Sequence, residues 1–365
     1  MATNYNGQLK SNEIFTSIYN LIIAQQVFAD NIAGTKSELV DAARVDGTLF
    51  GDTKLYYATD VLSSAPWGND AEAVNLLQLH RPADPKCQAL TIDKFFQISL
   101  TIDNYMSKRA WSDQDAFSSF NSVMQGWLGD TKKIYDATTY NAYVGTATTD
   151  VGRQKIEVDV TTAVGAATGE EAARIEAGTI AEAIANLLVD LKDVSRDFND
   201  YGFLRSYNVD DLIFVWNSKA VSKIEKRDLP TIYHKEIIDK FGEYTLPARY
   251  FGAVNADATA GDGSTVRSLI EQDVAPTSGS SPKKHVFAGD LIPSGYTATA
   301  GTSYTTNDKI LFKAIHKNSV PFMSAFSVST EFYNPAALLS NHYLIWGHNT
   351  LQYLQNYPFI TAIEK

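Results

Sequence analysis

The sequence predicts an α+β protein, and three observations support this. Apolar and polar residues alternate over 90–103, which is typical of a strand with one solvated face. Apolar residues recur at helical spacing over 117–135 and again over 175–198. A continuous apolar run at 212–216 follows the second of these helices and is typical of a strand buried on both faces. Helix, buried strand and helix in this order predict an α/β layer.

Length and composition indicate a globular protein with a large core. The chain has 365 residues, is 44% hydrophobic and contains 19 Tyr, 18 Phe and 5 Trp, which excludes general disorder. The single cysteine, Cys87, excludes an internal disulfide and a zinc site built on a cysteine cluster. No apolar run approaches the roughly 18–20 residues of a membrane span, and no secretory signal is readable, so we expect a protein made and kept in a cytoplasm.

The chain is acidic, with 31 Lys and Arg against 42 Asp and Glu and a formal charge of -11. This balance argues against strong nonspecific binding to nucleic acid, which depends on neutralising phosphates. The stretch 150–211 alone holds 13 acidic and 6 basic residues. We expect a solvated face there, or one that keeps an anionic partner at a distance.

The first hundred residues predict an arm followed by an extended segment. Residues 14–28 have the spacing of a short helix in an N-terminal arm, and 55–58 read as a strand. The alternating strand at 90–103, interrupted at Lys94, would be about 45 Å long, more than a compact domain usually accommodates. Its apolar stripe therefore predicts a surface outside its own domain, on a neighbouring subunit. The alternative is a long, bent strand wholly inside one sheet.

A long helix follows this strand, with Ser112 as its expected cap. Gly126 and Gly129 within it predict a kink or a close backbone approach. Further on, 156–160 reads as a short strand. Thr168 and Glu171 have the capping-box spacing and open a helix that runs through Phe198 to end near 202.

The last part of the chain predicts a short helix at 218–226, then a change of character. Gly, Ser, Thr, Ala and Pro dominate 255–308, which we interpret as a large, flexible surface region with short strands. Residues 320–328 and 342–346 restore a β-prone aromatic pattern, and 353–363 return to the core.

No constellation predicts catalysis, a cofactor or a metal. Nucleophile-elbow, phosphate-loop, dinucleotide and zinc-protease motifs are all absent from the sequence. His342 and His348 would lie about 20 Å apart on one face of a strand, too far to share a metal unless Gly347 makes a turn. The Asp residues of the 255–308 region miss the EF-hand spacing. We therefore expect a protein that is not an enzyme.

The order of these elements resembles the major capsid proteins of tailed bacteriophages with the HK97 fold. The resemblance rests on three segments: the strand 95–102 passing through 108–112 into the helix from 113, the helix 180–199 with the strand 211–219, and the final aromatic strands. They are similar to the family's extended loop and spine helix, its axial domain, and its peripheral domain.

The resemblance implies five regions. They are an N-terminal arm (1–50), an extended β-ribbon loop (51–111), the spine helix of the peripheral domain (112–150), an axial domain (151–318) with a flexible insertion (255–308), and closing strands of the peripheral domain (319–365). The expected inter-subunit contacts are Phe96, Ile98, Leu100, Ile102 and Trp67.

The resemblance also implies a function. Copies would assemble into hexamers and pentamers of an icosahedral phage head around double-stranded DNA, without sequence-specific DNA binding. Expected partners are further copies, a portal, and separate scaffolding or decoration proteins, with no membrane; the expected location is the virion, after assembly in the host cytoplasm. The alternatives are the shell subunit of an encapsulin-type nanocompartment, an α/β enzyme with dispersed site residues, and a phage tail or other interaction protein.

Overall fold

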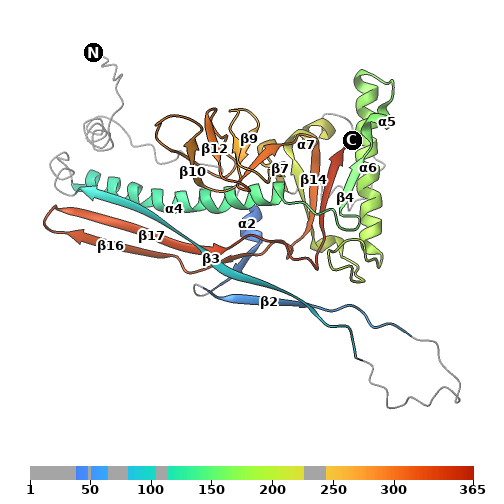
Figure 1. Cartoon of the computed structure of the whole chain (residues 1–365), viewed down its shortest axis with the longest axis horizontal. Helices are drawn as coiled ribbons and strands as arrows, with labels where there is room; N and C mark the ends of the chain where they lie inside the picture. Colours follow the sequence, from blue (N-terminus) through green and yellow to red (C-terminus); the bar gives the residue numbers. More distant parts are fainter. Residues whose placement is uncertain (1–37, 48–50, 65–80, 104–113, 226–243) are drawn as a thin grey trace.

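The computed structural model describes residues 38–47, 51–64, 81–103, 114–225 and 244–365. The expected arm helix at 14–28 and Trp67 lie outside these residues. The helices are α2 (Glu38–Ala42), α4 (Gln114–Thr146), α5 (Val160–Val164), α6 (Gly169–Lys192) and α7 (Ser218–Glu225). Figure 1 shows three regions: a body around α6, small sheets above α4, and a long ribbon of strands running beside α4.

The body contains a five-stranded mixed sheet in the order β4-β18-β14-β5-β6. Its strands are β4 (Lys155–Val158), β5 (Leu212–Asn217), β6 (Tyr244–Leu246), β14 (Ile310–His316) and β18 (Phe359–Glu364). Apolar residues of α6 pack on one face, against Phe214, Trp216 and Phe312. The end of α4 packs on the other face, near Val215 and Phe359. The predicted burial of the 212–216 strand on both faces is confirmed.

The second large sheet forms the ribbon and its base, in the order β1-β15-β17-β3-β2, with β16 also paired to β17. Its strands are β1 (Arg44–Asp46), β2 (Thr53–Ala58), β3 (Lys86–Asp103), β15 (Phe322–Ser324), β16 (Val328–Asn334) and β17 (Leu339–Asn349). β3 pairs with β2 along its first third and with β17 along the rest. The predicted long strand is confirmed and begins four residues earlier than expected.

The region 255–308 contains short strands, as the sequence predicts. It forms parts of two small sheets, β11-β10-β12-β8 and β7-β13-β9. Their strands are β7 (Gly252–Asn255), β8 (Thr259–Ala260), β9 (Val266–Ser268), β10 (Gln272–Pro276), β11 (Lys284–Val286), β12 (Tyr296–Ala298) and β13 (Ser303–Thr306). Val274 and Ile292 help to form its own small core. Asp262 accepts backbone N–H groups from Ser264, Thr265 and Val266, so its glycine-flanked turn is fixed rather than loose.

Four local expectations also need correction. The helix α6 ends at Lys192, so Val194 and Phe198 lie beyond it, and the side chain of Thr168 makes no capping hydrogen bond. Gly126 and Gly129 have open space around them rather than a close backbone neighbour. The final strand β18 joins the body sheet between β4 and β14, so the stretch 319–365 is divided between both large sheets. Sequence periodicity predicts strands, but it does not predict which sheet each strand joins.

The end of α4 is joined to the body through a buried lysine. Lys313 on β14 is fully buried, and its Nζ donates to the carbonyl of Ala147 (2.6 Å), just beyond α4, and to Oγ1 of Thr361 (3.0 Å). Burial lowers the pKa of Lys313 to about 7. A helix C-terminus attracts positive charge, which partly offsets the cost of burying this amine.

Candidate inter-subunit surfaces

The predicted contact stripe on β3 is largely covered by the chain itself. The ring of Phe96 lies 4.6 Å from that of Tyr135 on α4, measured between centroids. Ile102 is only 3% exposed, and Ile98 and Leu100 are half-buried on the same face. Within the chain α4 thus covers Phe96, while Ile98 and Leu100 keep part of their surface exposed, and β3 pairs within one continuous sheet.

Tyr135 anchors α4 to the ribbon through a second contact. Its hydroxyl lies 2.8 Å from Nε2 of His348, whose Nδ1 lies 2.7 Å from the carbonyl of Asn349. Since a carbonyl only accepts, Nδ1 carries the proton and Nε2 accepts from the tyrosine. Burial lowers the pKa of His348, which favours this neutral form. Gly347 lies within β17, so no turn brings His342 toward His348.

The first uncovered surface is at the finger base, which we define as residues 53–58 of β2 and 86–91 of β3. This pair of strands projects from the molecule on the side opposite the ribbon (Figure 1). Leu55 is 53% exposed and Tyr57 is 65% exposed. They lie opposite Ala89 and Cys87, which are exposed too. The finger base thus presents an uncharged, largely apolar face to solvent.

The finger base is held firmly from its other side. Gln88 donates to the carbonyl of Tyr353 (2.9 Å) and accepts the N–H of Gln355 (3.1 Å). Just past β2, Asp60 accepts the N–H of Leu204 (2.9 Å) and pairs with Arg196. These two partners lower the pKa of Asp60 to about 2. The direction in which the finger base projects is therefore fixed by the body.

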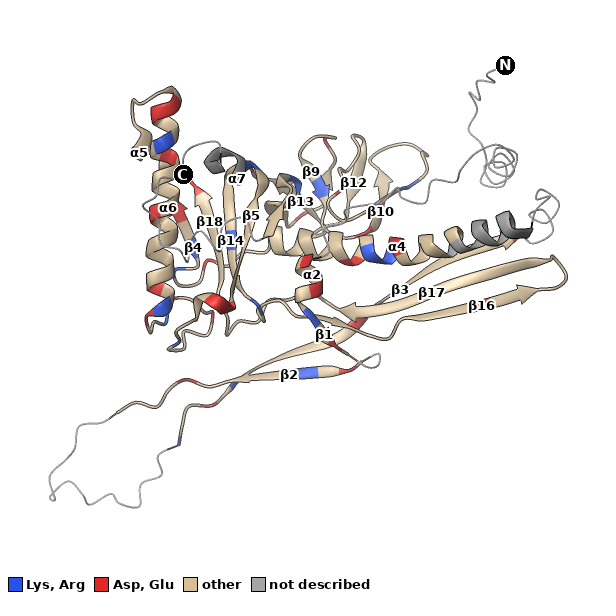
Figure 2. Ribbon diagram, turned by 180° about the vertical axis from the view of Figure 1, so that it is seen from behind, with Lys and Arg blue, Asp and Glu red and all other residues tan. Residues whose placement is uncertain are grey.

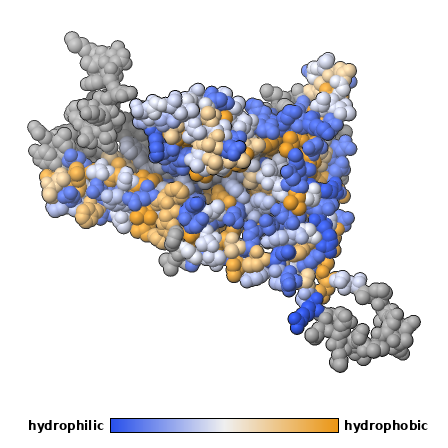
Figure 3. All heavy atoms as spheres, viewed as in Figure 1, coloured by the Kyte–Doolittle hydropathy of each residue, from blue (hydrophilic) through white to orange (hydrophobic). Residues whose placement is uncertain are grey.

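The second uncovered surface is the outer part of the ribbon. Phe332 on β16 is 66% exposed, and Phe326, Val328 and Tyr333 are also exposed. Figure 2 shows few charged residues on β16 and β17, whereas acidic residues follow α6, and Figure 3 shows apolar side chains gathered over the ribbon. Interface cores are depleted in charge and enriched in aromatic residues. The sequence shows these aromatic residues, but alternation does not tell that α4 packs on β3 and β17 and leaves β16 exposed.

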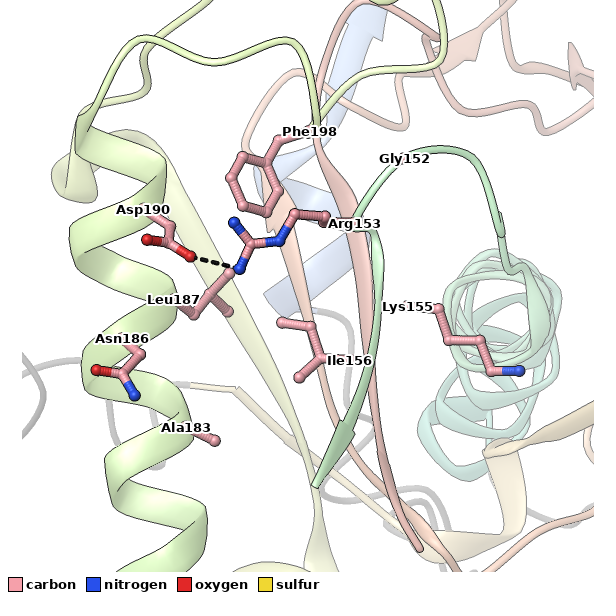
Figure 4. Close-up of a pocket in the computed structure, with 9 residues that line it drawn as sticks. All are labelled: Gly152, Arg153, Lys155, Ile156, Ala183, Asn186, Leu187, Asp190 and Phe198. Atoms are coloured by element: carbon pink, nitrogen blue, oxygen red, sulfur yellow. Dashed lines mark hydrogen bonds and ion pairs between the residues drawn. The ribbon is translucent and has the colours of Figure 1, made fainter. Parts of the chain in front are cut away.

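The body has a pocket of about 380 Å³ between α6 and β4. Its floor includes Ile156 and Leu187, and Phe198 stands beside them (Figure 4). Arg153 reaches across to Asp190 on α6 (2.8 Å), while Lys155 points away. The one carboxylate in the described lining is thus already paired, whereas acid–base catalysis usually combines perturbed groups that converge. Among the described residues no cluster of His, Cys, Asp or Glu is placed to share a metal, and no described helix has the length and apolarity needed to cross a bilayer.

The architecture has counterparts among solved structures. A chain in the capsid structure of Staphylococcus phage Andhra superposes with a TM-score of 0.59 and 11% identity, covering 93% of this chain and 87% of that one. The chain has the fold of a tailed-phage capsid protein. The predicted HK97-type, mixed α and β fold class is confirmed at this level.

A second solved structure has the same architecture. A chain in the structure of the head fiber and inner core protein gp22 of native bacteriophage P68 superposes with a TM-score of 0.63 and 10% identity, and covers 93% of this chain and 87% of that one. No protein-family model and no curated protein sequence matches this chain. Each matched chain shares about one identical residue in ten with this one, so the fold is similar although the sequences are not.

Proposed function

We propose that the chain is the major capsid subunit of a tailed phage, a structural protein rather than an enzyme. Copies assemble into hexamers and pentamers that close an icosahedral head around double-stranded DNA. The observation that carries this proposal is the shared fold with the Andhra capsid structure over 93% of this chain and 87% of the matched one. Coverage this complete on both sides leaves little of either chain for an added catalytic domain.

The regions of the chain take the following roles in this proposal. The segment 51–111 is the extended loop, and α4 is the spine helix of the peripheral domain. The segment 151–318 is the axial domain, to which β18 is now added. The ribbon strands β16 and β17 complete the peripheral domain, and the end of the N-terminal arm is held by the pairing of β1 with β15.

The finger base is the proposed contact between neighbours within a ring. Its exposed face centres on Leu55 and Tyr57, and a monomer leaves both in water. Burying an aromatic and an aliphatic side chain on a neighbour is favourable by about 1.5–3 kcal/mol for each side chain. Because Asp60 and Gln88 fix the direction of projection, the face is presented without a further ordering cost.

Other expected partners follow from this function. A portal, and separate scaffolding or decoration proteins, would contact the assembled head in the virion. The formal charge of -11 supports weak binding between the capsid subunits and the enclosed DNA. Like charges repel, and an acidic protein does not neutralise the phosphates. The encapsulated DNA would therefore be held by enclosure rather than by specific contacts.

Negative-stain electron microscopy of the purified chain, together with size-exclusion chromatography, tests the proposal. We expect closed shells, or rings of six and five subunits. A chain that stays monomeric throughout its soluble concentration range would contradict it. A version with Leu55→Asp and Tyr57→Asp serves as the matched control, since it should keep the fold and lose the rings.

A further inference from the structure

The strand β16 is an open edge of the ribbon. It pairs with β17 on one side, and within the described residues no strand pairs with its other side. Residues 328–333 are all exposed. Natural edge strands are usually protected by Lys, Pro, a bulge or a cover. Between Val328 and Asn334 there is no Lys or Pro, the pairing with β17 is regular, and the single charge is that of Glu331.

The space beside β16 is free over a defined length. β15 precedes β16 on the same side of β17, and β1 lies beyond β15. The pairing of β1 ends at Asp46 opposite Ser324, and the N–H of Gly47 then bonds the carbonyl of Ser324. In the described part of the chain nothing continues this outer strand position past Ser324. As far as the described residues go, an added strand therefore has room beside residues 326–334.

The sequence of β16 is complementary to itself. Paired residues share a face, so Val328, Thr330 and Phe332 point away from α4, as do their partners Ile345, Tyr343 and Asn341. An antiparallel copy centred on Thr330 would place Phe332 opposite Val328 of the second copy. The same register places Thr330 opposite its own equivalent and Glu331 opposite Ser329. Each of these pairs is favourable or neutral, whereas a register centred on Glu331 would oppose two like charges.

We propose that two copies of the chain pair through β16, antiparallel, about a two-fold axis at Thr330. The self-complementary pattern identifies the occupant as a second copy rather than an unrelated strand. The helix α4 does not obstruct the pairing, because Tyr135 places it over β3 and β17, through contacts with Phe96 and Trp346. The two helices are then separated by both copies of β16, while a helix is about 10–12 Å wide.

This contact differs in symmetry from the finger-base contact. A two-fold interface uses the same patch on both subunits, whereas contacts around a ring join two different patches. We therefore assign the β16 pairing to the contact between one ring and the next. This assignment rests on the proposed function. The same pairing would give a discrete dimer if rings did not form.

Disulfide trapping tests the register. The exposed native thiol is first removed by Cys87→Ser, and Thr330→Cys is compared with Ser329→Cys in that background. Directly opposed residues have Cα atoms about 4.5–5.5 Å apart, within the range that a disulfide spans. Two residues at position 329 would be diagonal neighbours, about 7–8 Å apart, and beyond that range. We expect mild oxidation to convert most of the T330C chain into a disulfide dimer and to leave S329C monomeric on a non-reducing gel.

Electron microscopy of the same samples separates this proposal from the proposed function. Shells or rings without a T330C dimer, or equal dimer from both variants, would overturn the β16 pairing and leave the capsid function standing. A T330C dimer without shells or rings would support the pairing and count against the capsid function. A chain that neither crosslinks nor assembles contradicts both.

Discussion

The body sheet and the ribbon bury their strands to different extents. All seven residues of β14 are buried, because α6 and α4 cover the two faces of its sheet. In β16 none of the seven is buried, and α4 covers only one face of the ribbon. The body therefore satisfies its hydrophobic surface within one chain, and the ribbon and finger base do not. Stability is concentrated in the first region, and the capacity to associate in the second.

The largest effect is expected on the covered face of the ribbon. Replacing Ile98 and Leu100 together by Asp places two charges at half-buried positions, on the face of β3 from which Phe96 packs against α4. Burial of polar groups without partners costs about 1–3 kcal/mol each. We expect the free energy of unfolding of the monomer to fall by several kcal/mol, measured by urea denaturation followed by circular dichroism. An unchanged midpoint would restore the view that this stripe is an inter-subunit surface.

The next effect concerns the buried amine that joins α4 to the body. The pKa of Lys313 is about 7 when folded and about 10.5 when unfolded, so the unfolded chain binds more protons between these values. Stability should therefore rise with pH over this window, by up to about 1.4 kcal/mol per pH unit. Below it Lys313 should add no pH dependence, because the amine is protonated in both the folded and the unfolded chain.

Lys313→Met provides the measurement for this effect. Urea denaturation from pH 6 to pH 10 should show a flatter pH dependence in the variant than in the original chain. If both chains gave parallel curves, the amine would be charged in the folded state throughout. The body would then tolerate a buried cation.

The smallest effect on folding is expected at the finger base. Leu55→Asp and Tyr57→Asp change exposed side chains, so the stability of the monomer should stay within about 0.5 kcal/mol. Assembly, followed by light scattering, should nevertheless be lost. Together with the Ile98 and Leu100 variant this forms a matched pair, because two apolar residues on one strand become Asp in each. If both double variants lost the same free energy of unfolding, the distinction between covered and uncovered faces would be contradicted.

The strands and helices could be predicted from the sequence wherever the pattern is local. The alternation in β3, the apolar run of β5 and the spacing in α6 each report a burial environment directly. The fold class followed from their order. The ends of elements were less accurate, since α6 stops at Lys192 although apolar residues continue at helical spacing to Phe198.

The assembly surfaces were harder to predict because they depend on what lies opposite. The stripe of Ile98 and Leu100 and the pair Leu55 and Tyr57 have the same alternating pattern. One of them meets α4, whose path is set by long-range contacts such as that between Tyr135 and His348, 213 positions apart. The length of β3 is accommodated by pairing with two different strands in turn, which the alternation by itself does not indicate.

The continuity of β3 has a mechanical consequence. A single backbone runs from the finger base to the far end of the ribbon, from Lys86 to Asp103. Tension along this line would load the ladders to β2 and β17 in shear, so that many hydrogen bonds must break together. A force that peels β16 sideways would break them one after another. If the proposed shell forms, internal pressure should be resisted along β3, and the edge of the ribbon should give way first.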